Sequence, residues 1–194
     1  MKLMLMTAAA AAALAMAVPA MAQDSTSSRT GVYGNLGWNE TQVEGANVGA
    51  INALIGGRFN NYLGLEGELN YGLTSDTRTF APGTANQNNV DIKQKLGGAV
   101  YGVGFLPLGQ NLDLLARVGW GEAHYRISPT GVGQYVATEN GLRYGVGAQY
   151  MLVNNTGIRL DWTREHLGDL SDSGGYFSGD RNANVWSIAL THKF

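Results

Sequence analysis

The residues that could do chemistry in this sequence are charged side chains on the polar faces of alternating segments. Carboxylates and guanidinium groups are both present, so buried members of the set could pair with one another. The candidates are Arg58, Glu66, Glu68, Arg117, Arg143, Arg159, Asp161 and Glu165. A buried charge without a partner costs several kcal/mol. The pattern therefore predicts an internal network of ion pairs whose role is structural.

Other chemistry has less support in the sequence. His124 and Ser128 are four residues apart, so on one strand they would share a face but lie more than about 10 Å apart, too far for a nucleophile and its base. Asp169, Asp172 and Asp180 lack the spacing of a calcium loop. We predict no catalytic residue, no metal site and no cofactor.

The elements that must position the charges are strands with two unlike faces. Apolar side chains occupy one parity, and glycine, polar and charged residues occupy the other, which is the period of a β-strand. We predict eight strands, close to residues 31–41, 49–59, 63–71, 91–105, 112–125, 142–150, 158–165 and 184–194. Between 91 and 105 the parity is blurred, so a bulge near Gly97–Gly98 is expected to re-phase the strand, and either face could point inward.

The connections alternate between short turns and long polar loops. Short turns begin at Asn60, Pro107 and Asn154, at equal intervals of 47 residues. Asparagine favours such turns because it tolerates positive φ. Long polar loops are predicted at about 40–48, 73–90, 127–139 and 169–182.

The first 22 residues have the form of a secretory signal peptide. Lys2 precedes a run of Ala, Leu and Met that ends in Ala20-Met21-Ala22, an A-x-A cleavage pattern. We predict cleavage after Ala22 and one barrel domain over residues 23–194. That mature chain has 12 basic and 15 acidic residues, a formal charge of −3, which argues against a nucleic-acid partner.

Composition favours a membrane barrel over a soluble one. Charged residues make up 14% of the chain, against about 25% in globular proteins. No segment of the mature chain is apolar enough for a transmembrane helix, so only a closed barrel could cross a bilayer. A soluble barrel would turn its apolar face inward, but the Gly-rich polar faces with few lysines suit a narrow interior better than a solvated surface.

Aromatic residues gather near the strand ends, where rings favour membrane interfaces. The predicted interface rings are Phe59, Tyr62, Phe105, Tyr150 and Phe194 near the short turns, and Trp38, Tyr71, Trp120, Trp162 and Trp186 toward the other end.

The last eleven residues resemble the C-terminal strand of bacterial outer-membrane barrels. Trp186, Ile188, Leu190 and Phe194 occupy alternate positions on one predicted membrane-facing side, and His192 departs from the apolar pattern. With the alternation of short turns and long loops, the chain from about residue 30 to 194 resembles the OmpA-type family of small outer-membrane barrels, including porin-family and opacity-type surface proteins. The resemblance implies an all-β, eight-stranded antiparallel up-and-down transmembrane barrel, located in the outer membrane after export.

The resemblance also implies a range of functions and partners. We expect a structural or surface-interacting protein whose interior is plugged by paired charges. The alternatives are a narrow porin-like channel for ions or small solutes and an adhesin that acts through its loops. A lipid-modifying outer-membrane enzyme is disfavoured, because neither a deacylase nor an acyltransferase motif is present. The implied partners are outer-membrane lipids and lipopolysaccharide, the barrel-assembly machinery acting through the C-terminal strand, and a surface ligand at the external loops.

Overall fold

A computed structural model describes residues 29–43, 46–80, 88–129, 135–153, 155–167 and 181–194. The predicted signal peptide lies outside these residues, as does most of the predicted loop at 169–182. The strands are β1 (Gly31–Val43), β2 (Ala46–Arg58), β3 (Leu63–Gly72), β4 (Ser75–Phe80), β5 (Asn88–Leu108), β6 (Leu112–Pro129), β7 (Tyr135–Val153), β8 (Thr156–Leu167) and β9 (Arg181–Lys193). Within the described ranges, no helix has the length and apolar character needed to cross a bilayer.

The strands close into an antiparallel barrel. The hydrogen-bonded order is β3-β2-β1-β9-β8-β7-β6-β5-β4, and β3 also pairs with β5, which completes the ring. β3 and β4 follow one another along the same neighbour, β5, so the labelled strands occupy eight positions around the barrel. The predicted eight-stranded antiparallel barrel is confirmed.

The predicted loop at 73–90 is wrong at residues 75–80 and 88–90, which belong to strands, and its residues 81–87 lie outside the described part of the chain. Residues Ser75–Phe80 form β4 and pair with β5 from Ser75↔Lys93 to Phe80↔Asn88. β4 lies beyond the apolar part of the barrel wall, so its side chains show no apolar alternation. Its backbone is held by hydrogen bonds to β5. The other loop predictions were also too long, since β1 and β2 reach Val43 and Ala46, and β6 and β7 reach Pro129 and Tyr135.

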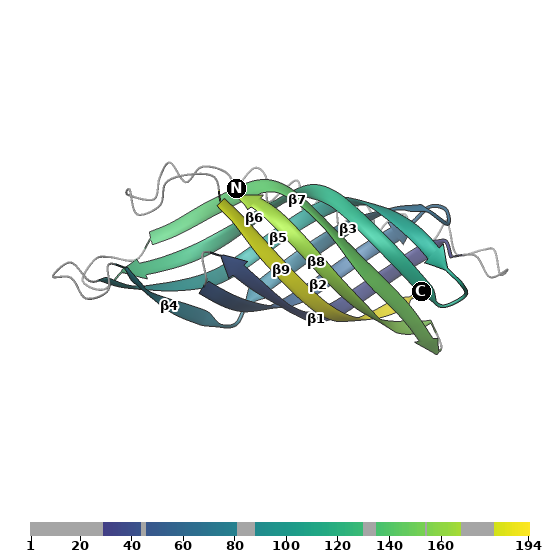
Figure 1. Ribbon diagram of the computed structural model, residues 1–194, viewed down its shortest axis with the longest axis horizontal. Helices are drawn as coiled ribbons and strands as arrows, with labels where there is room; N and C mark the ends of the chain where they lie inside the picture. Colours follow the sequence, from purple (N-terminus) through teal and green to yellow (C-terminus); the bar gives the residue numbers. More distant parts are fainter. Residues whose placement is uncertain (1–28, 44–45, 81–87, 130–134, 154, 168–180) are drawn as a thin grey trace.

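One end of the barrel is longer than the other. β5, β6 and β7 have 21, 18 and 19 residues, whereas about 9–11 residues suffice for a strand to cross a bilayer. Their excess length lies at the end where β4 is, on the left in Figure 1, and the C-terminus lies at the opposite end with the short turns. We call these the long-hairpin end and the short-turn end.

The wall of the barrel has an apolar outer face and a polar inner face. Leu190 is 63% exposed on the outside, whereas Glu66 and Arg159 are 0% exposed. The four predicted membrane-facing residues of the last strand, Trp186, Ile188, Leu190 and Phe194, are all exposed on the outer face. Exposed leucine, valine, isoleucine and tryptophan in such number need an apolar solvent, which a bilayer supplies.

A bulge in β5 settles which face of that strand points inward. The β5–β6 register shifts between Gln94 and Gly97, and beyond it Ala99, Tyr101, Val103 and Phe105 are buried. The prediction of Phe105 as a membrane-interface ring is therefore wrong: its parity after the bulge directs it into the barrel.

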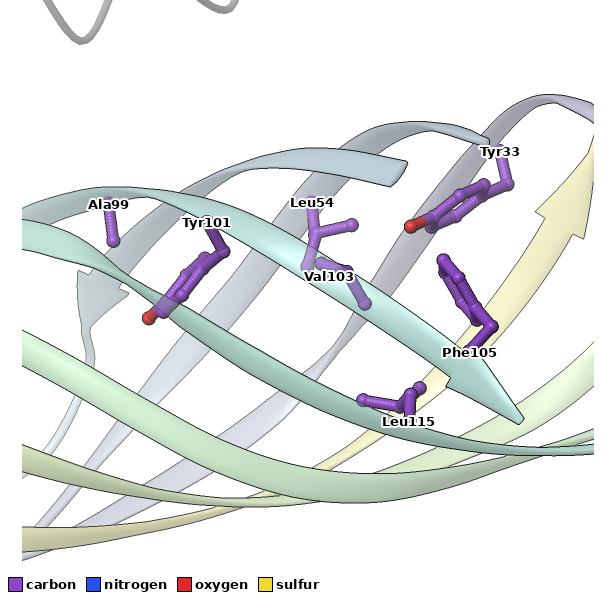
Figure 2. Close-up of a cluster of buried hydrophobic side chains, with 7 residues drawn as sticks. All are labelled: Tyr33, Leu54, Ala99, Tyr101, Val103, Phe105 and Leu115. Carbon is purple, nitrogen blue, oxygen red and sulfur yellow. The ribbon is translucent and has the colours of Figure 1, made fainter. Parts of the chain in front are cut away.

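An apolar cluster fills part of the interior. Its members are Tyr33, Leu54, Ala99, Tyr101, Val103, Phe105 and Leu115. Figure 2 shows these side chains directed into the space between the strands, with the rings of Tyr33 and Phe105 close together. Those two rings meet edge to face, with centroids 6.2 Å apart. The interior is thus a packed mixture of rings and charges.

Glycines on the inner face make room for large side chains. A Cβ on Gly121 would collide with the guanidinium of Arg143, and a Cβ on Gly56 would collide with the ring of Tyr33. Because an eight-stranded barrel is only wide enough for its own side chains, each bulky inward group needs a small residue beside it.

Candidate functional site

The centre of the barrel holds a bidentate ion pair that crosses the interior. Arg159 on β8 donates through Nη1 to Oε1 of Glu66 at 2.5 Å and through Nη2 to Oε2 at 3.1 Å. Its Nε donates to Asp161, at 2.9 Å and 3.1 Å from the two carboxylate oxygens. β3 and β8 lie four positions apart in either direction around the barrel, so this pair joins opposite walls.

Tyr33 joins the same centre from β1. Its hydroxyl donates to Oε1 of Glu66 at 2.5 Å. The Glu66 carboxylate thus accepts from both Arg159 and Tyr33, which offsets the cost of burying its charge.

A second arginine bridges β3 and β8 from β6. Arg117 donates through Nη1 to Oε2 of Glu68 at 2.9 Å, and through Nε and Nη2 to Oγ1 of Thr163 at 3.1 Å and 2.6 Å. Its guanidinium carbon lies 4.5 Å from the centroid of the Tyr101 ring, a cation–π contact. The same Nη1 is 3.9 Å from Glu66, which links this group to the central pair.

The third pair lies between neighbouring strands. Arg143 and Glu165 are direct cross-strand partners on β7 and β8, with Nη1 and Oε1 3.0 Å apart. Together these residues form what we call the ion-pair belt: Glu66, Glu68, Arg117, Arg143, Arg159, Asp161 and Glu165. All seven are buried, and three cations face four carboxylates, so the belt carries a formal charge of −1.

Arg58, the eighth predicted interior charge, lies apart from the belt at the short-turn end. Its Nη1 donates to Oδ2 of Asp113 at 2.8 Å, and its Nη2 donates to the carbonyl oxygen of Asn61 at 2.5 Å. Arg29, just before β1, donates to the same Asp113 carboxylate and to the carbonyl of Gly109. Two guanidinium groups therefore share one carboxylate here.

Several polar residues that contact the interior charges are not among the predicted set, and Asp113, Tyr33 and Arg29 are examples. Asp113 has the same parity on β6 as Arg117, so alternation could have found it. Tyr33 was assigned no role, although it lies on the parity opposite Val32 and Gly34. Arg29 precedes the first strand, where no alternation exists to place it.

Each of the three histidines contacts a polar side chain on a neighbouring strand. His124 lies between Oγ1 of Thr138, at 2.8 Å, and Oε1 of Glu122, at 3.2 Å. The other two histidines make the same kind of cross-strand contact, His192 with Thr156 at 2.9 Å and His166 with Asn182 at 3.0 Å. Each of the three histidine pairs with Thr138, Thr156 and Asn182 is a direct register pair of neighbouring strands, so strand pairing accounts for these three contacts, whereas Glu122 lies two residues before His124 on β6.

The chain belongs to a family of membrane barrels. Residues 8–194 match the family described as outer membrane protein beta-barrel domain. Among curated proteins, none matches the sequence significantly. In the part of the chain that the structure describes, no group of three or more histidine, cysteine or carboxylate residues could hold a metal ion.

Solved outer-membrane proteins share this fold at low sequence identity. Ail, the attachment invasion locus protein of Yersinia pestis, is 18% identical with a TM-score of 0.55, over 84% of this chain and 97% of that one. OprG from Pseudomonas aeruginosa is 13% identical with a TM-score of 0.60, over 87% and 98%. A major outer membrane protein from Thermus thermophilus is 10% identical with a TM-score of 0.60, over 84% and 99%. At such identities the likeness shows the fold alone.

Proposed function

We propose that this protein is a structural or surface-interacting barrel of the bacterial outer membrane, with an interior closed by paired charges and no catalytic role. It reaches that membrane after export and removal of residues 1–22, with the short-turn end in the periplasm, which is the usual orientation of such barrels. Membrane lipids and lipopolysaccharide surround it, and the barrel-assembly machinery acts on its last strand.

The observation that carries this proposal is the pairing of Arg159 with Glu66 across the barrel. The pair joins opposite walls, both side chains are 0% exposed, and Arg117 lies alongside. A solute passing along the axis would have to separate these charges in a low-dielectric interior. Breaking a buried pair costs about 3–5 kcal/mol, so the interior acts as a plug for passive diffusion.

Planar-bilayer recording tests the plug. The mature protein, refolded and checked for heat-modifiable gel mobility, is added to a bilayer and recorded over many insertions. We expect no regular conductance steps. A known porin added afterwards to the same bilayer is the control that insertion and detection work, and reproducible steps before that addition would contradict the plug.

A narrow channel is the second candidate, favoured by unsatisfied polar groups. Buried oxygens of Asn35, Asn39, Gln94 and Thr191 have no hydrogen-bond partner among the described residues. Such groups usually bind water, and a water-lined path interrupted only by the belt could conduct ions when the belt opens. Conductance that rises in E66Q, where the central pair is weakened, would favour this candidate.

An adhesin that acts through its long hairpins is the third candidate. β5, β6 and β7 extend well beyond the length needed to cross a bilayer, at the end that faces outward in this orientation. Ail, which shares the fold, is an attachment protein and was solved with the heparin analogue sucrose octasulfate. Shortening the β6–β7 hairpin within residues 127–137 should abolish surface attachment without changing heat-modifiable mobility, whereas unchanged attachment would argue against this role.

A further inference from the structure

We propose that the short-turn end holds a binding site for a phosphate-type oxyanion. A cavity of about 310 Å³ opens there, between the ends of β1, β2, β5, β6, β7 and β9. This volume exceeds the space that a single hydrated anion needs, since one water occupies about 30 Å³ of liquid. We call it the short-turn mouth.

The lining of the mouth is cationic. Arg29, Arg58 and Lys193 line it, and Asp113 is the single carboxylate side chain among the lining residues. Lys193 extends over Gly31, where a Cβ would lie 3.5 Å from its Cε. A terminal carboxylate on Phe194, at the same rim, would still leave the lining with excess positive charge. The ion-pair belt, by contrast, has a slight excess of carboxylates.

A buried amide gives a second, independent indication of a ligand. Gln149 lines the mouth and is 8% exposed. Its Nε2 donates to Sδ of Met151 at 3.4 Å, while its Oε1 is buried without a hydrogen-bond partner among the described residues. A buried acceptor of this kind calls for a donor that the surrounding protein does not supply.

A hydrogen phosphate meets both requirements. Its charged oxygens accept from guanidinium and ammonium groups. A rotation of the Gln149 amide, whose Oε1 has almost no accessible surface in the structure, would bring this oxygen to the cavity, where the phosphate hydroxyl can donate to it. The same chemistry is found in free inorganic phosphate and in an anionic phospholipid headgroup, whose glycerol hydroxyls are also donors. The rim carries Leu152 and Val153, both exposed, so a headgroup could enter with its apolar part against them.

Nuclear magnetic resonance on the refolded mature protein tests the site. Inorganic phosphate is titrated at constant ionic strength, which removes general screening effects, and the backbone amides of Gly31, Gln149 and Asn155 are followed. A second arm compares nanodiscs of phosphatidylcholine with and without phosphatidylglycerol, in phosphate-free buffer. Saturable shifts at the mouth in the first arm identify a free-anion site, and shifts in the second arm alone identify a headgroup site.

Two variants and a matched control make the test specific. K193Q should weaken binding roughly tenfold, the scale of one lost hydrogen bond to a charged group. Q149E keeps the size of the side chain but adds a negative charge, and should abolish binding while leaving the fold intact. K93Q makes the same charge change at the long-hairpin end and should bind like the wild type. The proposal is overturned if neither arm gives saturable shifts at the mouth, or if K193Q and Q149E bind as K93Q does.

Discussion

The ion-pair belt and the short-turn mouth contain the same residue types and differ in how those residues are satisfied. In the belt, the Glu66 carboxylate accepts from Arg159 and Tyr33, and Arg159 also bonds to Asp161. At the mouth, Arg29 and Arg58 share Asp113 beside an open cavity. Paired charge in a closed space holds the walls together, whereas at the mouth the lining has a net positive charge that the proposed anion would balance.

Removing a carboxylate from the belt should give the largest loss of stability. In E66A, Arg159 loses its bidentate partner and Tyr33 loses its acceptor, in a region that water does not reach. We expect the free energy of unfolding to fall by about 3–5 kcal/mol, measured by denaturant titration in lipid vesicles with tryptophan fluorescence as the signal.

The triple variant E66L/R159M/D161N is the matched control for E66A, because Arg159 also holds the Asp161 carboxylate. Replacing a whole buried ion-pair group by uncharged residues of similar volume is often neutral, so this variant should be more stable than E66A. If both variants lower the free energy of unfolding equally, the stability loss in E66A does not come from an unpaired charge. The belt would then not differ from the mouth in the way described above.

A charge on the outer face at the level of the belt should have the next largest effect. Ile188 lies on β9 opposite Leu160 and Trp38, and the neighbouring Ala189 pairs with Arg159. I188R should reduce stability in vesicles by about 2–4 kcal/mol if this level lies near the bilayer midplane. The control N182R, at the exposed far end of β9, should cost no more than about 1 kcal/mol; equal costs would place the belt outside the hydrocarbon.

Neutralising Asp113 should cost less than neutralising a belt carboxylate. D113N leaves Arg58 and Arg29 with a neutral acceptor, but water in the cavity can solvate both. We expect a loss of about 1–3 kcal/mol in the same denaturant titration. A loss as large as that of E66A would show that the mouth is as dry as the belt.

The smallest effect on stability is expected at Lys193. K193Q removes one charge from a half-exposed rim position and should change the free energy of unfolding by less than about 0.5 kcal/mol. Phosphate binding should weaken in the same sample, so the variant separates binding from stability. A large loss of stability would contradict this expectation and show that Lys193 holds the rim together, and Q149E against K93Q then decides whether the mouth binds phosphate.

Much of the fold could be predicted from the sequence because a membrane barrel exposes its pattern directly. Lipid on one side and a narrow interior on the other impose strict alternation. The patterns of residues 142–150 and 158–162 therefore predict which side chains face lipid and which face the interior. The failures fall where that constraint ends. β4 lies beyond the apolar part of the wall and has no alternation. In β5 the predicted bulge leaves the inward face undecided, and the position of Phe105 near a strand end predicts an interface ring, whereas the register after the shift between Gln94 and Gly97 directs it inward.

The charged interior could be anticipated only as a set of residues. Parity placed Glu66 and Arg159 on inward faces, but their sequence separation of 93 residues contains no signal for pairing. Which charges meet depends on how the strands stagger around the whole ring, and that is fixed by all registers together. Arg58 shows what alternation alone does not predict. Its side chain faces inward like those of the belt residues, but its position along the barrel axis places it at the mouth.

The cross-barrel pair also constrains how this protein can assemble. Glu66 on β3 meets Arg159 on β8, four positions away, and no hairpin contains both. Such long-range contacts form late in folding, so the two side chains keep their hydration until the first and last strands join. Entry of these charges into the hydrocarbon region is therefore tied to ring closure, and any agent that delays the joining of β1 to β9 should slow insertion as a whole.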